Sequence, residues 1–163
     1  MKTKKLTSLA LCACVALILS YIESLLPPLF SAVQGVKMGL ANIMIIFALY
    51  RYGWRAAGAV SITRIVLSAL LFGNAWSLAY SICGGALSLL LMALLKKTDR
   101  FSYVGVSIVG GISHNAGQVL LAMIALKTRE IGFYMIILSF SGIVSGILVG
   151  LAAALMLKYV KKV

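Results

Sequence analysis

The chain is a succession of long apolar stretches separated by short breaks that are charged or rich in turn-forming residues. The hydrocarbon core of a bilayer, about 30 Å thick, takes about 20 helical residues. With 63% hydrophobic residues, 11% charged residues and a mean hydropathy of +1.09, the 163 residues are too apolar for a soluble domain. The sequence therefore predicts an all-α integral membrane protein in which residues 1–163 form a single transmembrane domain.

Six stretches are expected to cross the membrane. Their approximate bounds are 6–26, 39–50, 56–72, 76–95, 101–126 and 131–157. The first should end at Pro27-Pro28, because proline cannot continue a helix, and the second is short. The basic start before the first stretch also resembles a signal peptide, but the length of that stretch and the further spans favour a retained helix.

The lysines and arginines are unevenly divided between the two expected faces. Six spans place both termini on one face, and of the 15 basic residues eleven fall there: Lys2, Lys4, Lys5, Arg51, Arg55, Lys96, Lys97, Arg100, Lys158, Lys161 and Lys162. Three fall on the other face (Lys37, Lys127 and Arg129), and Arg64 lies within a span. The positive-inside rule then predicts a multi-pass protein of the cell membrane with both termini cytoplasmic. The net charge of +12 is thus a topology signal that suits anionic membrane lipid, and we expect no nucleic-acid partner.

Residues 107–121 place the only histidine of the chain and two carboxamides inside an apolar segment. At helical spacing one face carries Ser107, Gly110, Gly111, His114 and Gln118, and Asn115 lies at its edge. A further ionisable residue, Arg64, lies at similar depth in the third span. Ionisable groups inside a membrane cost about 2.5–3.5 kcal/mol each on insertion scales, so they usually face a cavity or a partner.

These residues predict a binding site for a small anionic or polar substrate. Arg64 and Lys37 would hold the charge, and hydrogen bonds would come from Asn42, Asn74, His114, Asn115 and Gln118. In the structural alternative, Arg64 pairs with Glu23, the amides tie helices together, and Asn42 and Asn74 cap helix ends.

Small residues recur at four-residue spacing in two spans. Those of the first span, which we call the small-residue strip, are Ser8, Cys12, Ala16 and Ser20. This strip suits either contact with a partner protein or internal packing. Gly142, Gly146 and Gly150 of the last span are expected to be packing residues.

Several classes of chemistry lack their residues. The chain has no Gly-x-x-x-x-Gly-Lys-Ser/Thr loop for ATP, and its three acidic residues are scattered, so magnesium-dependent diphosphate chemistry is not expected. The three cysteines lie within predicted spans and indicate neither a disulfide framework nor a metal site. We expect no enzyme, no metal and no cofactor.

Four segments resemble signatures of the Gx transporter or heptaprenyl diphosphate synthase component I family. They are Gly35-Val-Lys37-Met-Gly39-Leu-Ala-Asn42, Leu71-Phe-Gly73-Asn74, Tyr80-Ser-Ile-Cys-Gly84-Gly85 and Gly110-Gly111-Ile-Ser-His114-Asn115-Ala-Gly117-Gln118. That family is similar to the membrane-embedded substrate-binding components, the S-components, of energy-coupling factor transporters. The resemblance implies six helices, cytoplasmic termini and a small-residue face on the first helix that docks on a coupling subunit.

The resemblance leads to one main expectation and two alternatives. The main one is a substrate-binding component of a transporter that is energised by a separate ATPase module through a coupling subunit. The heptaprenyl label implies instead a non-catalytic membrane accessory of polyprenyl diphosphate or quinone synthesis, because the aspartate-rich motifs of a synthase are missing. A small secondary carrier, with His114 or Glu23 relaying protons, is the third reading.

Overall fold

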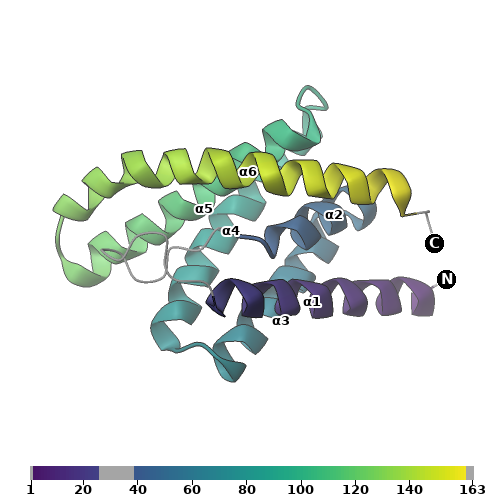
Figure 1. Cartoon of the computed structure of the whole chain (residues 1–163), viewed down its shortest axis with the longest axis horizontal. Coiled ribbons are helices and arrows are strands. Elements are labelled where there is room, and N and C mark those ends of the chain that lie inside the picture. Colours follow the sequence, from purple (N-terminus) through teal and green to yellow (C-terminus); the bar gives the residue numbers. More distant parts are fainter. Residues whose placement is uncertain (1, 26–38, 161–163) are drawn as a thin grey trace.

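The computed structural model describes residues 2–25 and 39–160. Within these ranges it contains six α-helices and one short 3-10 helix, in the order α1 (Lys2–Leu25), α2 (Asn42–Tyr52), α3 (Trp54–Leu71), α4 (Ala75–Lys97), α5 (Tyr103–Leu126), η1 (Glu130–Phe133) and α6 (Tyr134–Tyr159) (Figure 1). No strand occurs in these two described ranges. The prediction of an all-α membrane protein with six helices is confirmed.

Five of the six α-helices are long and apolar enough to cross a membrane, and α2 is the exception. Its 11 residues span only about 16 Å at 1.5 Å per residue. The helix ends at Gly53, whose φ of 93° lies in the left-handed region that favours glycine. Every residue from Met44 to Leu49 is buried, so α2 is apolar all round and lies inside the bundle.

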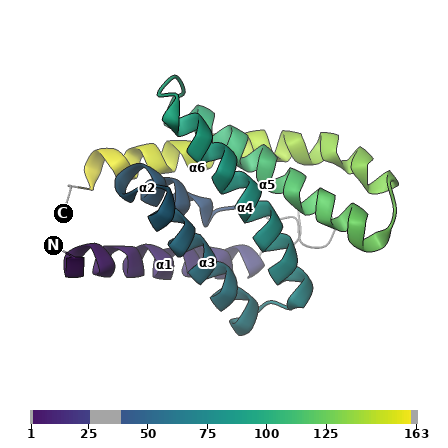
Figure 2. The same ribbon diagram turned by 180° about the vertical axis from the view of Figure 1, so that it is seen from behind.

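The contacts between helices fall into two groups, those made by α5 and those made by α2 and α3. Contacts are most extensive between α5 and α6 and between α4 and α5, while α2 touches α1, α3 and α6, and α3 joins α1 to α4. In both ribbon views the start of α1 and the end of α6 lie at the same end of the molecule (Figures 1 and 2). The helical hairpins thus return the chain to the end at which it begins.

Hydrogen bonds from basic side chains fix the end of the bundle where α2 meets α3. Lys96 Nζ donates to the carbonyl oxygen of Leu49 at 2.6 Å, and Arg51 donates to the carbonyl oxygen of Val160. Tyr50 and Tyr103 pack edge to face with their ring centroids 4.6 Å apart. These contacts tie the end of α2 to α4, α5 and α6, and they place cations at the end shared by the start of α1 and the end of α6.

Glycines bring α5 and α6 into backbone contact. A Cβ built at Gly146 would lie 2.6 Å from Ile108 Cα, and one at Gly150 would lie 2.7 Å from Val104 Cα. At Gly142 the nearest atom would be the backbone nitrogen of Ile112, 2.9 Å away. No larger residue fits these positions, so the prediction that this glycine series serves packing is confirmed.

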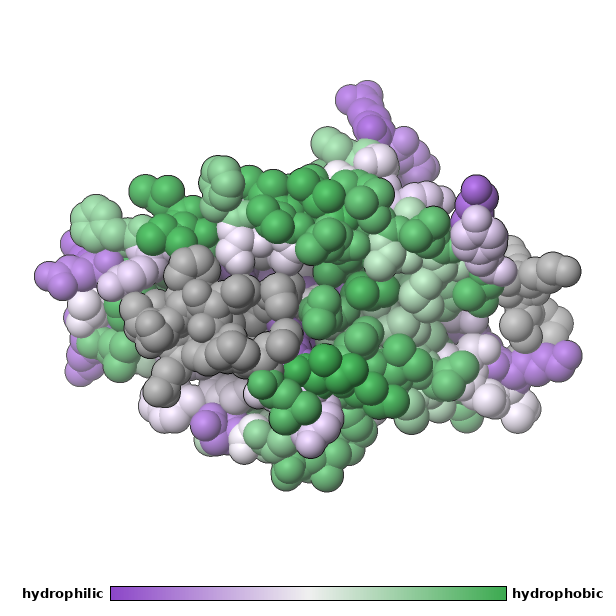
Figure 3. Space-filling model, in the orientation of Figure 1, coloured by the Kyte–Doolittle hydropathy of each residue, from purple (hydrophilic) through white to green (hydrophobic). Residues whose placement is uncertain are grey.

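The outer surface is mostly apolar between its two ends. In Figure 3 hydrophobic residues cover most of the coloured part of the visible face, and most of the strongly hydrophilic residues lie at its outer edges. Large apolar side chains such as Leu11, Leu70, Ile124 and Phe140 are exposed. An exposed apolar belt of this kind is expected where helices face lipid.

The small-residue strip of α1 faces inward. Cys12, Ala16 and Ser20 are buried, Ala16 completely, and Ser8 is half-buried. Cys12 and Ala16 belong to the apolar core that surrounds α2. This placement favours the internal-packing reading of the strip, and its role in docking a coupling subunit stays a prediction.

Candidate functional site

Arg64 lies in the middle of α3 on the side that faces α1. The residue is only 7% exposed, and its Nη1 donates to Ser20 Oγ over a long 3.4 Å. Its Nε is buried and has no hydrogen-bond partner within the part of the chain that the structure describes. An arginine carries five N–H donors, so this guanidinium retains capacity for an acceptor.

Glu23 lies beside this arginine on α1. Its carboxylate is buried, accepts a hydrogen bond of 2.5 Å from the backbone nitrogen of Gly39, and attracts the charge of Arg64. Ser20 and Glu23 are three residues apart and share one face of α1. The attraction between Glu23 and Arg64 is in line with the structural alternative, while Arg64 Nε has no hydrogen-bond partner within the described ranges.

His114 and Gln118 form a second polar cluster, on the face of α5 that meets α4. Gln118 Nε2 lies 3.3 Å from His114 Nε2, at hydrogen-bond distance, and both side chains are buried. A Cβ at Gly84 of α4 would lie 2.7 Å from the His114 carbonyl oxygen and 3.1 Å from Gln118 Cγ. The absence of a side chain at Gly84 makes the room that these two residues occupy.

The neighbouring glycines Gly84 and Gly85 of α4 face two different helices. Gly84 faces α5, whereas a Cβ at Gly85 would lie 3.2 Å from Ile65 Cδ1 and 3.6 Å from Ser61 Oγ of α3. Arg64 bonds to Ser20 of α1, and His114 lies at hydrogen-bond distance from Gln118 of its own helix. The two polar clusters thus belong to different helix interfaces, Arg64 to that of α3 with α1 and His114 to that of α5 with α4.

Two of the predicted amides have structural partners. Asn115 Nδ2 donates to the Leu138 carbonyl oxygen of α6 at 2.7 Å, which ties α5 to α6. Asn74 caps α4, because its Oδ1 accepts a hydrogen bond of 2.8 Å from the Ser77 nitrogen. These contacts are those of the structural alternative, so the case for a ligand at Asn115 and Asn74 is weaker than at Arg64.

Asn42 and Lys37 complete the predicted set. Asn42 is the first residue of α2 and does not cap it; the capping position is Ala41. Its side chain lines a small hollow between α2, α5 and α6, together with Ser107, Gly111 and Ser145. Lys37 lies outside the described residues.

Neither Ser20 nor Glu23 belongs to the predicted substrate-binding set; Glu23 was expected only as a partner of Arg64 or as a proton relay, and Ser20 only as part of the small-residue strip. Their i, i+3 spacing near the end of the first span, with a carboxylate at membrane depth, is the signal that indicates a shared polar face. In the described ranges no group of three or more His, Cys, Asp or Glu side chains could hold a metal ion.

The fold and the buried polar clusters define a multi-pass, all-α membrane protein. The family model for heptaprenyl diphosphate synthase component I matches residues 12–156. The chain therefore belongs to the heptaprenyl diphosphate synthase component I family. No curated protein matches the chain. No solved structure matches it either.

Proposed function

We propose that this chain is a membrane-embedded substrate-binding component of an energy-coupling factor type transporter for a small anionic substrate. A separate ATPase module would supply the energy, since the sequence has no ATP-binding loop of its own. In this proposal the protein is not an enzyme, lies in the cell membrane, and has both termini on the cytoplasmic side.

The observation that carries the proposal is the buried guanidinium of Arg64. A cation at membrane depth is costly unless charge and hydrogen bonds compensate it. Glu23 balances the charge, but the planar fork has a buried Nε that is not used within the described ranges. A carboxylate or phosphate could take that donor as part of a two-bond contact, which a point charge such as lysine does not offer.

The His114–Gln118 cluster supports a role in orienting a substrate. A neutral imidazole can donate or accept, and a carboxamide can do both at once. Both side chains are on α5 and face α4, whose Gly84 leaves space beside them. Such a pair adds hydrogen-bond specificity without adding a second buried charge.

The family description favours one alternative, a non-catalytic accessory of polyprenyl diphosphate synthesis. The two functions differ in their protein partners. A transporter component should associate with a coupling subunit and ATPases, whereas an accessory should bind a soluble prenyl synthase.

Purification of the tagged chain from its native membranes in a mild detergent, followed by mass spectrometry of proteins and small molecules, tests the proposal. We expect ATPase subunits and a small anionic molecule to co-purify. An Arg64→Gln variant should keep the protein partners and lose the small molecule. Recovery of a prenyl synthase in place of ATPases would reject the transporter and favour the accessory function.

A further inference from the structure

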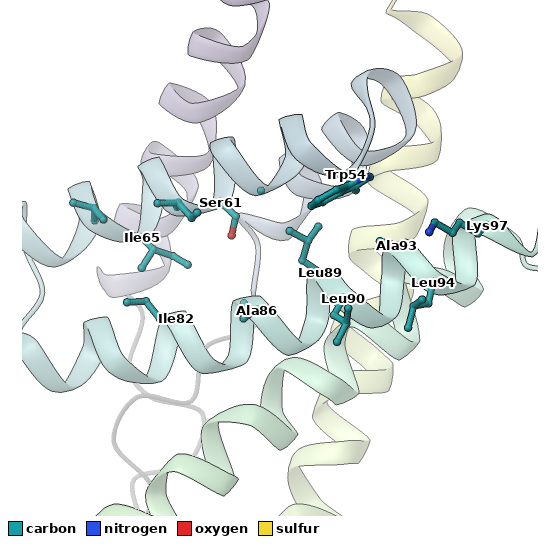
Figure 4. Close-up of a pocket in the computed structure, with 14 residues that line it drawn as sticks. Trp54, Ser61, Ile65, Ile82, Ala86, Leu89, Leu90, Ala93, Leu94 and Lys97 are labelled. Atoms are coloured by element: carbon teal, nitrogen blue, oxygen red, sulfur yellow. The ribbon is translucent and has the colours of Figure 1, made fainter.

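A pocket of about 660 Å³ lies between α3 and α4, and its lining includes neither Arg64 nor the His114–Gln118 pair (Figure 4). Its volume is within the range of small-molecule sites, about 300–1,000 Å³. We call it the α3–α4 pocket; it is lined mainly by apolar side chains, among them Ile65, Ile82, Leu89 and Leu90. Ile82 and Leu90 are also exposed, so the pocket opens to the outside of the bundle, where the surface is apolar.

The pocket is long, and its ends differ in polarity. Trp54 and Lys97 lie toward one end, and Ile65 and Ile82 lie toward the other (Figure 4). From Trp54 to Val66 along α3 the length is about 18 Å at 1.5 Å per residue. Half of a bilayer core is about 15 Å, so the pocket is as long as one leaflet is deep.

Positive charge gathers at the Trp54 end. Lys97 lines the pocket there, and the Arg55 guanidinium lies over the Trp54 ring, 5.4 Å from its centroid. Both cations are exposed. Asp99, which follows Lys97 by two residues, acts on Lys96 and Tyr50 toward α2.

We propose that the α3–α4 pocket binds an acyl chain of an anionic phospholipid, whose phosphate lies at Arg55 and Lys97. An apolar trough one leaflet long suits a hydrocarbon chain, and a tryptophan with two cations at its end suits the interfacial headgroup. The lipid enters laterally, because the pocket opens on the apolar surface. This site is distinct from the proposed substrate site, because Arg64 bonds toward α1 and neither Arg64, His114 nor Gln118 lines the pocket.

The two tryptophans of the chain provide a direct test. Trp54 lines the pocket, and Trp76 is exposed near the start of α4, at the opposite end of that helix from Lys97. Trp76→Phe leaves Trp54 as the sole reporter, and Trp54→Phe leaves Trp76 as its matched control. Each variant is reconstituted in vesicles of equal parts phosphatidylglycerol and phosphatidylcholine, in which either one or the other lipid carries bromines on its acyl chains as fluorescence quenchers.

The fluorescence of Trp54 should be quenched more strongly when phosphatidylglycerol carries the bromines than when phosphatidylcholine does. This preference should be about fivefold or more, because one basic residue near an anionic headgroup contributes that much. Trp76 should show no preference. Arg55→Gln combined with Lys97→Gln should remove the preference at Trp54, and these exposed positions can change without unfolding the chain. Filling the pocket with Ala86→Leu and Ala93→Leu should lower quenching of Trp54 even though both cations remain.

Equal quenching of Trp54 by the two lipids would overturn the proposal. So would a preference that survives in the filled variant, because it would come from diffuse attraction to the basic end. Weak quenching of Trp54 by both lipids would also overturn it and would indicate that a protein covers the pocket.

Discussion

Gly84 of α4 lies directly against the backbone of His114 of α5, so that a Cβ at this glycine would come within 2.7 Å of the His114 carbonyl oxygen. The approach holds the imidazole and Gln118 in the interface between the two helices. A glycine in α4 therefore sets the position of the polar cluster on α5.

Replacing Gly84 with alanine should destabilise the protein. The new methyl group would meet backbone, which cannot move aside cheaply, and overpacking of this kind costs about 1–3 kcal/mol. Gly58→Ala is the matched control, because its Cβ would meet only the flexible tip of Leu89 at 3.4 Å. There the gain in helix propensity should leave the melting temperature in detergent unchanged or raised. Equal melting temperatures for the two variants would contradict the packing described at Gly84.

Asn115 should matter for stability more than for substrate. Removal of its hydrogen bond to Leu138 by Asn115→Ala should cost about 0.6 kcal/mol, the average for interhelical hydrogen bonds within a membrane, and no more than about 1.7 kcal/mol, the largest value found. The small molecule that co-purifies with the unmodified chain should still be recovered. Thermal unfolding and mass spectrometry on the same preparation check both statements, and loss of the small molecule at full stability would make Asn115 a ligand residue.

Whether the small-residue strip of α1 serves internal packing or docking can be tested by substitutions at two nearby positions of that helix. Ala16 is completely buried, whereas Cys14 is exposed on the other side of the helix. Ala16→Leu should lower the melting temperature through overpacking, and Cys14→Leu should not. If Ala16→Leu instead keeps full stability and abolishes co-purification with a coupling subunit, the strip is a docking face.

The topology follows from the division of charge and from the number of helices. A reporter fused after Val163 should be cytoplasmic, and one inserted near Glu130 should be external. The short α2 makes this a demanding test, because the termini share a side only if α2 and its flanking residues complete a crossing. Two reporters on the same side would reject the six-span topology.

Much of the fold could be predicted, because each junction between helices is marked by residues that lie next to one another in the sequence. Charged or glycine-containing junctions such as Arg51–Arg55 mark the helix ends, and the 142/146/150 spacing identifies a packing face. The short length of α2 was also visible in the sequence. That α2 is buried all round was not, because an apolar run looks the same whether it faces lipid or protein.

The candidate site was less predictable, because its contacts join residues far apart in sequence. Arg64 and Ser20 are separated by 44 residues, and only the packing of α1 on α3 brings them together. Spacing placed Asn115 at the edge of the polar face of α5, but whether its amide turns toward a ligand or toward α6 depends on where α6 lies. Depth along a span likewise could not tell that Arg64 faces α1 whereas His114 faces α4.

Arg64 carries the central claim, and the most direct measurement is the affinity for the co-purifying anion together with the melting temperature in Arg64→Lys, Arg64→Gln and Arg64→Gln/Glu23→Gln. If the guanidinium holds the anion through two bonds, Arg64→Lys should lose at least about tenfold in affinity, or about 1.4 kcal/mol, and Arg64→Gln should lose more while remaining folded. The Glu23→Gln change should then leave affinity low. Intact affinity in Arg64→Gln, with a lowered melting temperature that Glu23→Gln restores, would contradict the anion site and make the pair structural.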